Sequence, residues 1–305
     1  MGAISYRPQY SLDILLHKLF DYAGMFPPVQ RSFDQALRES SSFPTTLSRP
    51  WIVGSDLVLD TANARKLASE NFRALGYRSP PVICVLATEE TLHVTETVSA
   101  LADRGQHVQL AAIEAKVQPD SMSEIVAAYA PLTTSLGALL AIEPDLSGED
   151  WRESLSKTAA FISRVRGSVA LKCRCSGPTG IGPDRLAAAI IEVSDKGIAF
   201  KVTGGLHHPI VEPDRYPFPT GFLNVVSALM LRRAMGESAP ESFLVELLSN
   251  RSISEIQFHS GLAYRGISIS HDQLIQAKLQ AHFSIGSCSL HEPDSDLSRL
   301  VTGAS

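Results

Sequence analysis

Two lysines on neighbouring apolar segments are the residues of this sequence best suited to chemistry. Lys172 lies in the segment Ser168–Gly177, and Lys201 lies in the segment Ile198–Pro209. Each segment reads as a buried strand that ends in glycine. Because burying an unpaired ammonium group is costly, we expect both lysines to point into a polar cavity and not into apolar packing.

The order of side chains in the second segment assigns a direction to its lysine. Side chains alternate between the two faces of a strand. Lys201 shares a face with Ala199 and Thr203, whereas the bulky Phe200 and Val202 share the other face. We expect the bulky face to meet a layer of helices, so that Lys201 points away from the helices into the interior of a barrel.

The first segment follows the same rule. Ala170, Lys172 and Arg174 share the inward face, and Cys173 and Cys175 share the outward face. Buried thiols behave as small apolar groups, so we expect these two cysteines to pack against helices without a metal or redox role.

Carboxylates that could balance these cations follow other apolar runs. Glu114 and Glu143 each end such a run, and Asp21 lies near the first apolar segment. Together with Lys172 and Arg174 they predict a charge-compensated pocket of the kind that shifts pKa values. The alternatives are a purely structural ion-pair network, a surface position for Glu114 beyond the end of its strand, and a turn position for Asp21.

The elements that must hold these side chains alternate between strand and helix. Apolar strands repeated in this way indicate a parallel sheet, and eight such units predict a (β/α)8 TIM barrel as one domain over residues 1–305. The expected strands are 19–26, 51–57, 82–87, 108–115, 138–143, 169–175, 198–204 and 282–287. The expected helices are 62–75, 89–104, 121–129, 150–165, 183–195 and 222–235.

One stretch of the chain is too long for a simple strand–helix unit. It runs from about residue 210 to about residue 270, and we expect it to hold a helix at 241–248 and a hairpin at 255–268 that turns near Ser260-Gly261. We interpret it as a helical and hairpin insertion that caps the barrel mouth or forms a subunit contact. An open doubly wound sheet is the second choice of fold, but the phosphate-binding G-x-G-x-x-G turn is absent after the first strand.

Composition narrows the classes of partner. The chain is 44% hydrophobic and 19% charged with a net charge of −5, and it has neither a basic block nor an apolar run long enough for a membrane helix. We therefore expect a small-molecule partner, no nucleic acid and no membrane, with a homo-oligomer left open. Four cysteines are too few for a disulfide framework, and the first residues lack a signal-peptide core, so we expect a cytoplasmic protein.

Glycines and serines at two predicted strand ends suggest an anion site. Gly204 and Gly205 follow Thr203, and Ser287 and Ser289 lie in the turn after the last strand. Loops after strands 7 and 8 often hold a phosphate group in barrels. We therefore expect these residues to contact the anionic part of a substrate.

Two adjacent histidines follow the glycines. His207 and His208 would contact substrate if the loop turns both of them inward, and otherwise one packs in the core while the other lies on the surface. Together with Glu114 and Glu143 they could alternatively bind a divalent metal ion. Their spacing matches no recognised zinc pattern.

Three phrases in the last strands resemble class I aldolases of the deoxyribose-phosphate aldolase type. They are Leu171-Lys172, Lys201–Gly205 and Gly286–Ser289. The resemblance implies a barrel fold, a Schiff base on Lys201 with Lys172 as its electrostatic neighbour, and a phosphate site at Gly205, Ser287 and Ser289. The whole chain also resembles bacterial proteins of this length that carry the phrases D-Y-A-G-x-F-P-P, K-x-R, G-L-H-H-P and G-S-C-S, a resemblance that implies no function.

The sequence thus predicts a lyase that needs no cofactor and no metal. Lys201 would attack the carbonyl group of a small anionic or phosphate-bearing compound after Lys172 and Arg174 have lowered its pKa, and Glu114 or Glu143 would transfer protons. Arg174 could instead clamp a substrate carboxylate. The alternatives are a metal-dependent lyase or isomerase and a protein that binds an anionic small molecule without turnover.

Overall fold

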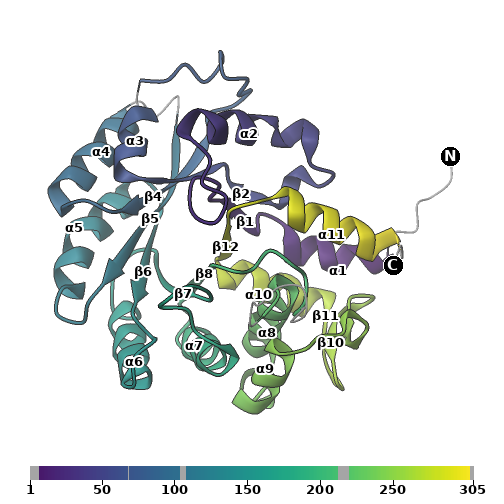
Figure 1. Ribbon diagram of the computed structural model, residues 1–305. Helices are drawn as coiled ribbons and strands as arrows, with labels where there is room; N and C mark the ends of the chain where they lie inside the picture. Colours follow the sequence, from purple (N-terminus) through teal and green to yellow (C-terminus); the bar gives the residue numbers. More distant parts are fainter. Residues whose placement is uncertain (1–6, 68, 104–107, 212–219, 303–305) are drawn as a thin grey trace.

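A parallel β-barrel organises the part of the chain that the structure describes. The computed structural model describes residues 7–67, 69–103, 108–211 and 220–302 (Figure 1). Neighbouring strands in the main sheet follow the order β2-β1-β12-β8-β7-β6-β5-β4-β3. Their bounds are β1 Phe20–Tyr22, β2 Val53–Ser55, β3 Leu57–Asp60, β4 Val82–Ala87, β5 Gln109–Val117, β6 Leu139–Pro144, β7 Val169–Arg174, β8 Ala199–Thr203 and β12 Phe283–Ser287.

The two edge strands of this sheet are halves of one barrel strand. β2 pairs with β1 and β3 pairs with β4, and only Asp56 separates β2 from β3. The backbone N–H of Asp56 donates to the carbonyl of Val82 at 2.8 Å, and its carboxylate accepts from the backbone N–H of Val82 at 2.8 Å. The ring of strands therefore has eight positions, which confirms the predicted (β/α)8 barrel.

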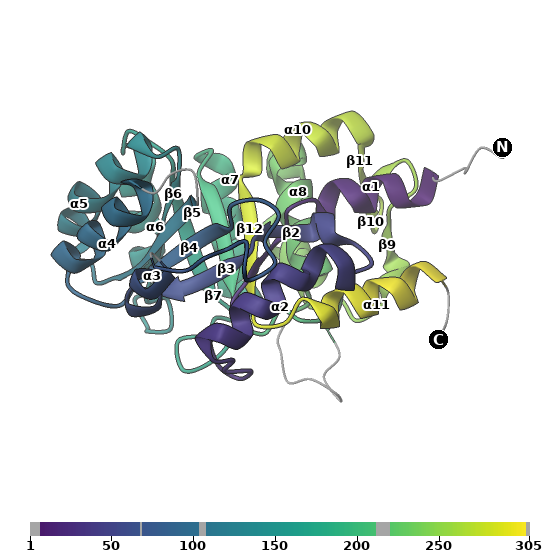
Figure 2. The same ribbon diagram turned by 90° about the horizontal axis from the view of Figure 1, so that it is seen from above.

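Helices cover the outside of the ring, as Figures 1 and 2 show. Their bounds are α1 Arg7–Leu16, α2 Phe33–Thr46, α3 Thr61–Leu67, α4 Thr91–Asp103, α5 Met122–Ser135, α6 Trp151–Ile162, α7 Pro183–Asp195, α8 Phe222–Met235, α9 Glu241–Leu248, α10 His271–Ala281 and α11 His291–Thr302. No helix of the described segments is both long and apolar enough to cross a membrane.

The strand alternation separates a large outer core from a small inner one. Phe200, Val202 and Cys173 belong to the large apolar cluster between strands and helices. Ala170 and Ala199 form, with an alanine of β6, a separate small cluster inside the ring. Small side chains at this level leave space above them for long polar side chains, as the sequence predicts.

Three helices have the predicted bounds, whereas the hairpin differs from its prediction. Residues 256–270 form a three-stranded antiparallel sheet of β9 (Ile256–Gln257), β10 (Gly261–Tyr264) and β11 (Ile267–Ser270). The hairpin of β10 and β11 turns at Arg265-Gly266, both with positive φ, instead of at Ser260-Gly261. Glycine at the second turn position supplies this conformation without steric cost, which fixes the register.

The small sheet lies on the flank of the barrel. It contacts α8 and α10, and Figure 2 shows it beside α1 and α10. Both helices belong to the outer layer, and a cap over the barrel mouth stays a prediction. Residues 212–219 of the proposed insertion lie outside the described residues, and the subunit contact stays a prediction.

A buried asparagine fastens the start of α8, the helix that follows the candidate site. The side-chain amide of Asn224 donates to the carbonyls of Leu247 and Asn250 at 2.7 and 3.0 Å. Its carbonyl oxygen accepts from the backbone N–H of Gly221 at 3.1 Å. Asn224 has no exposed surface, so water cannot replace these hydrogen bonds.

We expect Asn224→Ala to lower the free energy of unfolding by roughly 2–4 kcal/mol, because it leaves buried carbonyl groups without a donor. Urea unfolding followed by circular dichroism measures the change, which should move the midpoint without altering the slope.

Ser227→Ala on the same helix is the matched control. Ser227 is fully buried, and its hydroxyl has no hydrogen-bond partner among the described residues, so its removal should be neutral or slightly stabilising. Equal destabilisation by the two variants would contradict this account of α8.

Candidate active site

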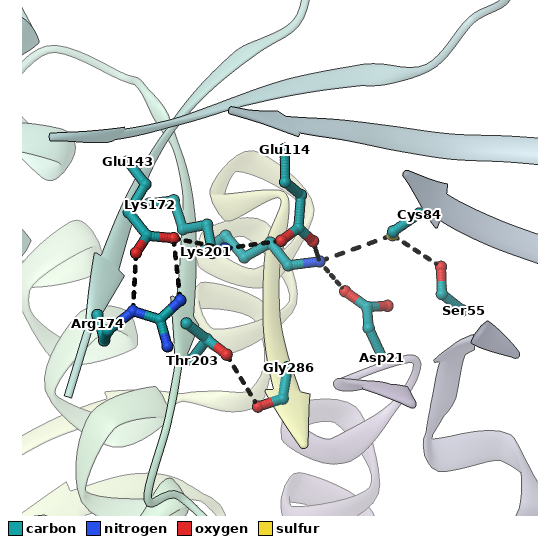
Figure 3. A network of polar contacts seen from close by, with 10 residues as sticks. All are labelled: Asp21, Ser55, Cys84, Glu114, Glu143, Lys172, Arg174, Lys201, Thr203 and Gly286. Atoms are coloured by element: carbon teal, nitrogen blue, oxygen red, sulfur yellow. Dashed lines mark hydrogen bonds and ion pairs between the residues drawn. The ribbon is translucent and has the colours of Figure 1, made fainter. Parts of the chain in front are cut away.

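Lys201 lies inside the barrel between carboxylates from two distant parts of the chain. Its Nζ contacts the carboxylate of Asp21 on β1 and lies 2.6 Å from Oε1 of Glu114 on β5 (Figure 3). The contact with Asp21 is a hydrogen bond, whereas the contact with Glu114 is an ion pair outside hydrogen-bond geometry. Only 1% of Lys201 is exposed, so the charge is balanced by protein groups and not by solvent.

Lys172 continues the chain of ion pairs toward β6 and the barrel mouth. Its Nζ lies 2.8 Å from Glu114 and 2.6 Å from Glu143. Nε of Arg174 then donates to Glu143 at 2.8 Å. The structure thus brings together six of the residues predicted for the site, which are Asp21, Glu114, Glu143, Lys172, Arg174 and Lys201.

Two features position these side chains: the register between neighbouring strands and the alternation of side chains along each strand. Lys172 and Lys201 are paired across β7 and β8, and Asp21 is paired with Gly286 across β1 and β12. Glu114 lies within β5, which continues to Val117, so its predicted alternative as a surface residue is wrong.

The environment of Lys201 keeps its amine protonated. Burial alone would lower the pKa of Lys201, but the negative charges of Asp21 and Glu114 outweigh burial and raise the pKa well above its ordinary value. This reverses the expectation from sequence that neighbouring cations lower this pKa. Two carboxylates contact the ammonium group directly, and that accounts for the difference.

The carboxylates are held in their ionised form. Burial opposes the charge of Glu114, but Lys172 and Lys201 together lower its pKa to about 2. Burial likewise opposes the charge of Glu143, and Lys172 and Arg174 lower its pKa below the ordinary value. At neutral pH, ionised carboxylates therefore alternate with cations along the network.

Cys84 and Ser55 complete the network on the side of β4, and sequence reasoning missed them. Nζ of Lys201 lies 3.7 Å from Sγ of Cys84, which lies 3.1 Å from Oγ of Ser55. Burial raises the pKa of Cys84 to about 12, so the thiol stays neutral beside the ammonium group. The sequence signal is the alternation of side chains along β4. Ile83 and Val85 face the helices, so Cys84 between them faces inward.

The predicted anion site is assembled from adjacent turns, but its hydroxyl groups have protein partners. Gly204 and Gly205 both have positive φ, and Gly286 is paired with Thr203 across β12 and β8. The Thr203 hydroxyl donates to the carbonyl of Gly286 at 3.4 Å.

The two predicted serines also have partners in the turn after β12. The Ser287 hydroxyl donates to the carbonyl of Ser289 at 2.6 Å. The Ser289 hydroxyl accepts from the backbone N–H of Glu292 at 3.4 Å, at the start of α11. Both serines therefore support the local backbone, and their role with a substrate stays a prediction.

The two histidines are buried but face different partners. Nδ1 of His208 lies 2.7 Å from the carboxylate of Asp296 on α11. His207 lies beside Ser287 and Cys288. Among the residues that the structure describes, no group of three or more His, Cys, Asp or Glu side chains could hold a metal ion, so the set proposed from sequence is not gathered.

No family model, curated protein or solved structure matches the chain. Its site is therefore interpreted from its own geometry.

The pKa of Glu114 links the network to acid stability. A carboxylate whose pKa is lowered from 4.5 to about 2 by folding stabilises the protein above about pH 4.5. That stability, about 3 kcal/mol at 1.36 kcal/mol per pKa unit, is lost as the pH falls from about 4.5 to about 2.

We expect Glu114→Gln to destabilise the protein at pH 7 by roughly 3–5 kcal/mol, because it leaves an excess buried cation. The variant should also lose less stability than the wild type when the pH falls from 5 to 2. Urea unfolding at a series of pH values measures both effects. Glu124→Gln on the exposed face of α5 is the control, and a Glu114→Gln variant that behaves like it would refute the buried network.

Proposed function

We propose that this chain is an aldolase-type lyase that acts on a small anionic carbonyl compound through an imine on Lys201. The observation that carries the proposal is the position of Nζ of Lys201, which lies inside the barrel between carboxylates from β1 and β5. Catalytic residues of barrel enzymes lie at the carboxyl ends of the strands, and Asp21, Arg174 and Thr203 all lie at or near such ends.

The resting ammonium group must lose a proton before it can attack a carbonyl carbon. Glu114 is the suitable acceptor, since its carboxylate contacts both Lys201 and Lys172. A substrate that displaces Asp21 from Lys201 removes the largest contribution that raises the pKa of the amine. When Glu114 becomes neutral on taking up the proton, Lys172 keeps its second ion pair, with Glu143.

Imine formation can proceed with Lys201 as the nucleophile and Glu114 as the group that accepts and returns a proton. The nitrogen of Lys201 bonds to the carbonyl carbon, and one proton of that nitrogen moves to the carbonyl oxygen to give a carbinolamine. A second proton, returned by Glu114, lets that oxygen leave as water. The resulting iminium group accepts the electron pair of the C–C bond that breaks, or supplies the enamine for the reverse condensation.

Arg174 is the group best placed for the anionic part of the substrate. Its side chain is 28% exposed, whereas those of Lys172 and Lys201 are 3% and 2% exposed. Its guanidinium group already binds a carboxylate, that of Glu143, through Nε and one terminal nitrogen. A substrate carboxylate or phosphate could pair with the same planar group.

The raised pKa of Lys201 favours a second candidate function. A protein that binds an anionic small molecule without turnover would use the ammonium group of Lys201 and the guanidinium group of Arg174 as fixed charges. Ligand affinity that persists without any covalent adduct on Lys201 distinguishes this candidate from the lyase.

Borohydride trapping tests the imine directly. We expect sodium cyanoborohydride with a panel of small keto acids and phosphorylated aldehydes to leave a reduced adduct on Lys201, found by peptide mass mapping. Because the free amine forms by transfer of the Lys201 proton to Glu114 within the complex, the trapping rate should stay nearly constant between pH 7 and pH 9.

Two lysine variants serve as the control pair. Lys201→Met should abolish the adduct, whereas Lys172→Met should retain it on Lys201 at a lower yield. The proposal fails if no member of the panel modifies Lys201, or if the adduct forms only on exposed lysines such as Lys157.

A further inference from the structure

Three loops at the carboxyl ends of the strands meet at one thiol that the Lys201 network does not use. Sγ of Cys288, which follows β12, lies 3.5 Å from Nε2 of His207, which follows β8. Val29, in the loop after β1, lies close enough for its backbone to lower the pKa of the same thiol. Two of the recurring phrases, G-L-H-H-P and G-S-C-S, thus converge on this point, and Val29 directly follows the third, D-Y-A-G-x-F-P-P.

The imidazole of His207 has partners on both of its nitrogens. Sγ of Cys288 lies 3.5 Å from Nε2 and 4.0 Å from Nδ1, and Nδ1 also lies 3.3 Å from Oγ of Ser287 and 3.5 Å from the carboxylate of Glu292. A nucleophile beside a base, with the base oriented by a third group, is the arrangement that activates a thiol or hydroxyl for attack. Here the nucleophile is Cys288 and the base is His207, both in loops. The third group is Glu292 on α11.

The charges around the pair keep both members neutral at neutral pH. Burial lowers the pKa of His207, and Glu292 opposes this effect while His208 adds to it. Burial and the charge of Glu292 raise the pKa of the Cys288 thiol to about 11. Asp296 on α11, which pairs with His208, is a further charged group close to the pair.

A neutral thiol beside a neutral imidazole is suited to an addition that needs no leaving group. Cys288 and His207 are each 8% exposed, so only a small molecule can reach them. Addition to an aldehyde also needs no oxidant and no further reactant. It is therefore the covalent step that this geometry supports with the groups at hand.

We propose that Cys288 and His207 form a nucleophile–base pair that binds a small aldehyde covalently as a hemithioacetal at the barrel mouth. Sγ bonds to the carbonyl carbon while the thiol proton moves to Nε2 of His207. The same proton then passes to the former carbonyl oxygen, and reversal of the steps releases the aldehyde. This pair does not depend on the imine at Lys201.

Alkylation of Cys288 by iodoacetamide, followed by peptide mass mapping between pH 6 and pH 10, tests the pair. Assisted by His207, the wild-type rate should be nearly constant from about pH 7 to about pH 10, between the pKa values of the imidazole and the thiol. In His207→Gln the rate at pH 7.5 should fall at least about tenfold and then rise about tenfold per pH unit. An unchanged rate and pH profile in His207→Gln would overturn the proposal.

Glyoxylate tests the covalent step, with glycolate as the matched compound that lacks the carbonyl group. Glyoxylate should protect Cys288 from alkylation and glycolate should not, and removal of glyoxylate by dialysis should restore the rate. Protection by both compounds, or by neither, contradicts the hemithioacetal. Borohydride adducts on Lys201 report only on the imine, so failure of one proposal is distinguishable from failure of the other.

A second variant guards against misfolding of His207→Gln. The side chain of Glu292 is 55% exposed, so Glu292→Gln should fold normally, which urea unfolding checks. Because Glu292 favours the imidazolium form of His207, the variant should slow alkylation of Cys288 about two- to fivefold at pH 7.5. Alkylation at the wild-type rate in a folded Glu292→Gln variant would also count against the pair.

Discussion

The interior of this barrel depends on the balance of charge between two lysines, one arginine and three carboxylates. Removing an ion from water costs several kcal/mol even in a relaxed protein, so each member requires its partners. The cations come from β7 and β8, and the carboxylates come from β1, β5 and β6. The network therefore also ties together strands that are distant in sequence, and loss of one charge leaves another buried without a counter-ion.

The same balance limits the chemistry of the site. Lys201 is held as an ammonium group by Asp21 and Glu114, so a carbonyl compound must change those contacts before the nitrogen can attack. Binding and activation are then one event, because the substrate itself removes the interaction that blocks the reaction. Arg174, the most exposed of the cations, offers the first contact for an anionic substrate.

Much of this arrangement follows from local patterns in the sequence. The alternation of side chains along single strands predicted that Lys172, Arg174 and Lys201 lie on the inner face, and the alternation of strands and helices predicted the barrel. The sign of the pKa shift of Lys201 was predicted wrongly, because it depends on which side chains lie nearest across the ring. Asp21, 180 residues away in sequence, is the decisive neighbour, and no local pattern gives its distance. The hairpin turn was predicted at the wrong place because the segment offers two glycines suited to a turn. The loops around Cys288 are distant in sequence, and they come together only because the strands close into a ring.

The protonation state of Lys201 tests the account most directly. The side-chain amine can be followed by nitrogen NMR on protein with ¹⁵N-labelled lysine, with the Lys201→Met variant assigning the signal. We predict that the Lys201 amine stays protonated to above pH 10.5, the ordinary lysine value. A Lys201 amine that loses its proton near pH 7 would contradict the buried, charge-balanced network on which the rest of the account depends.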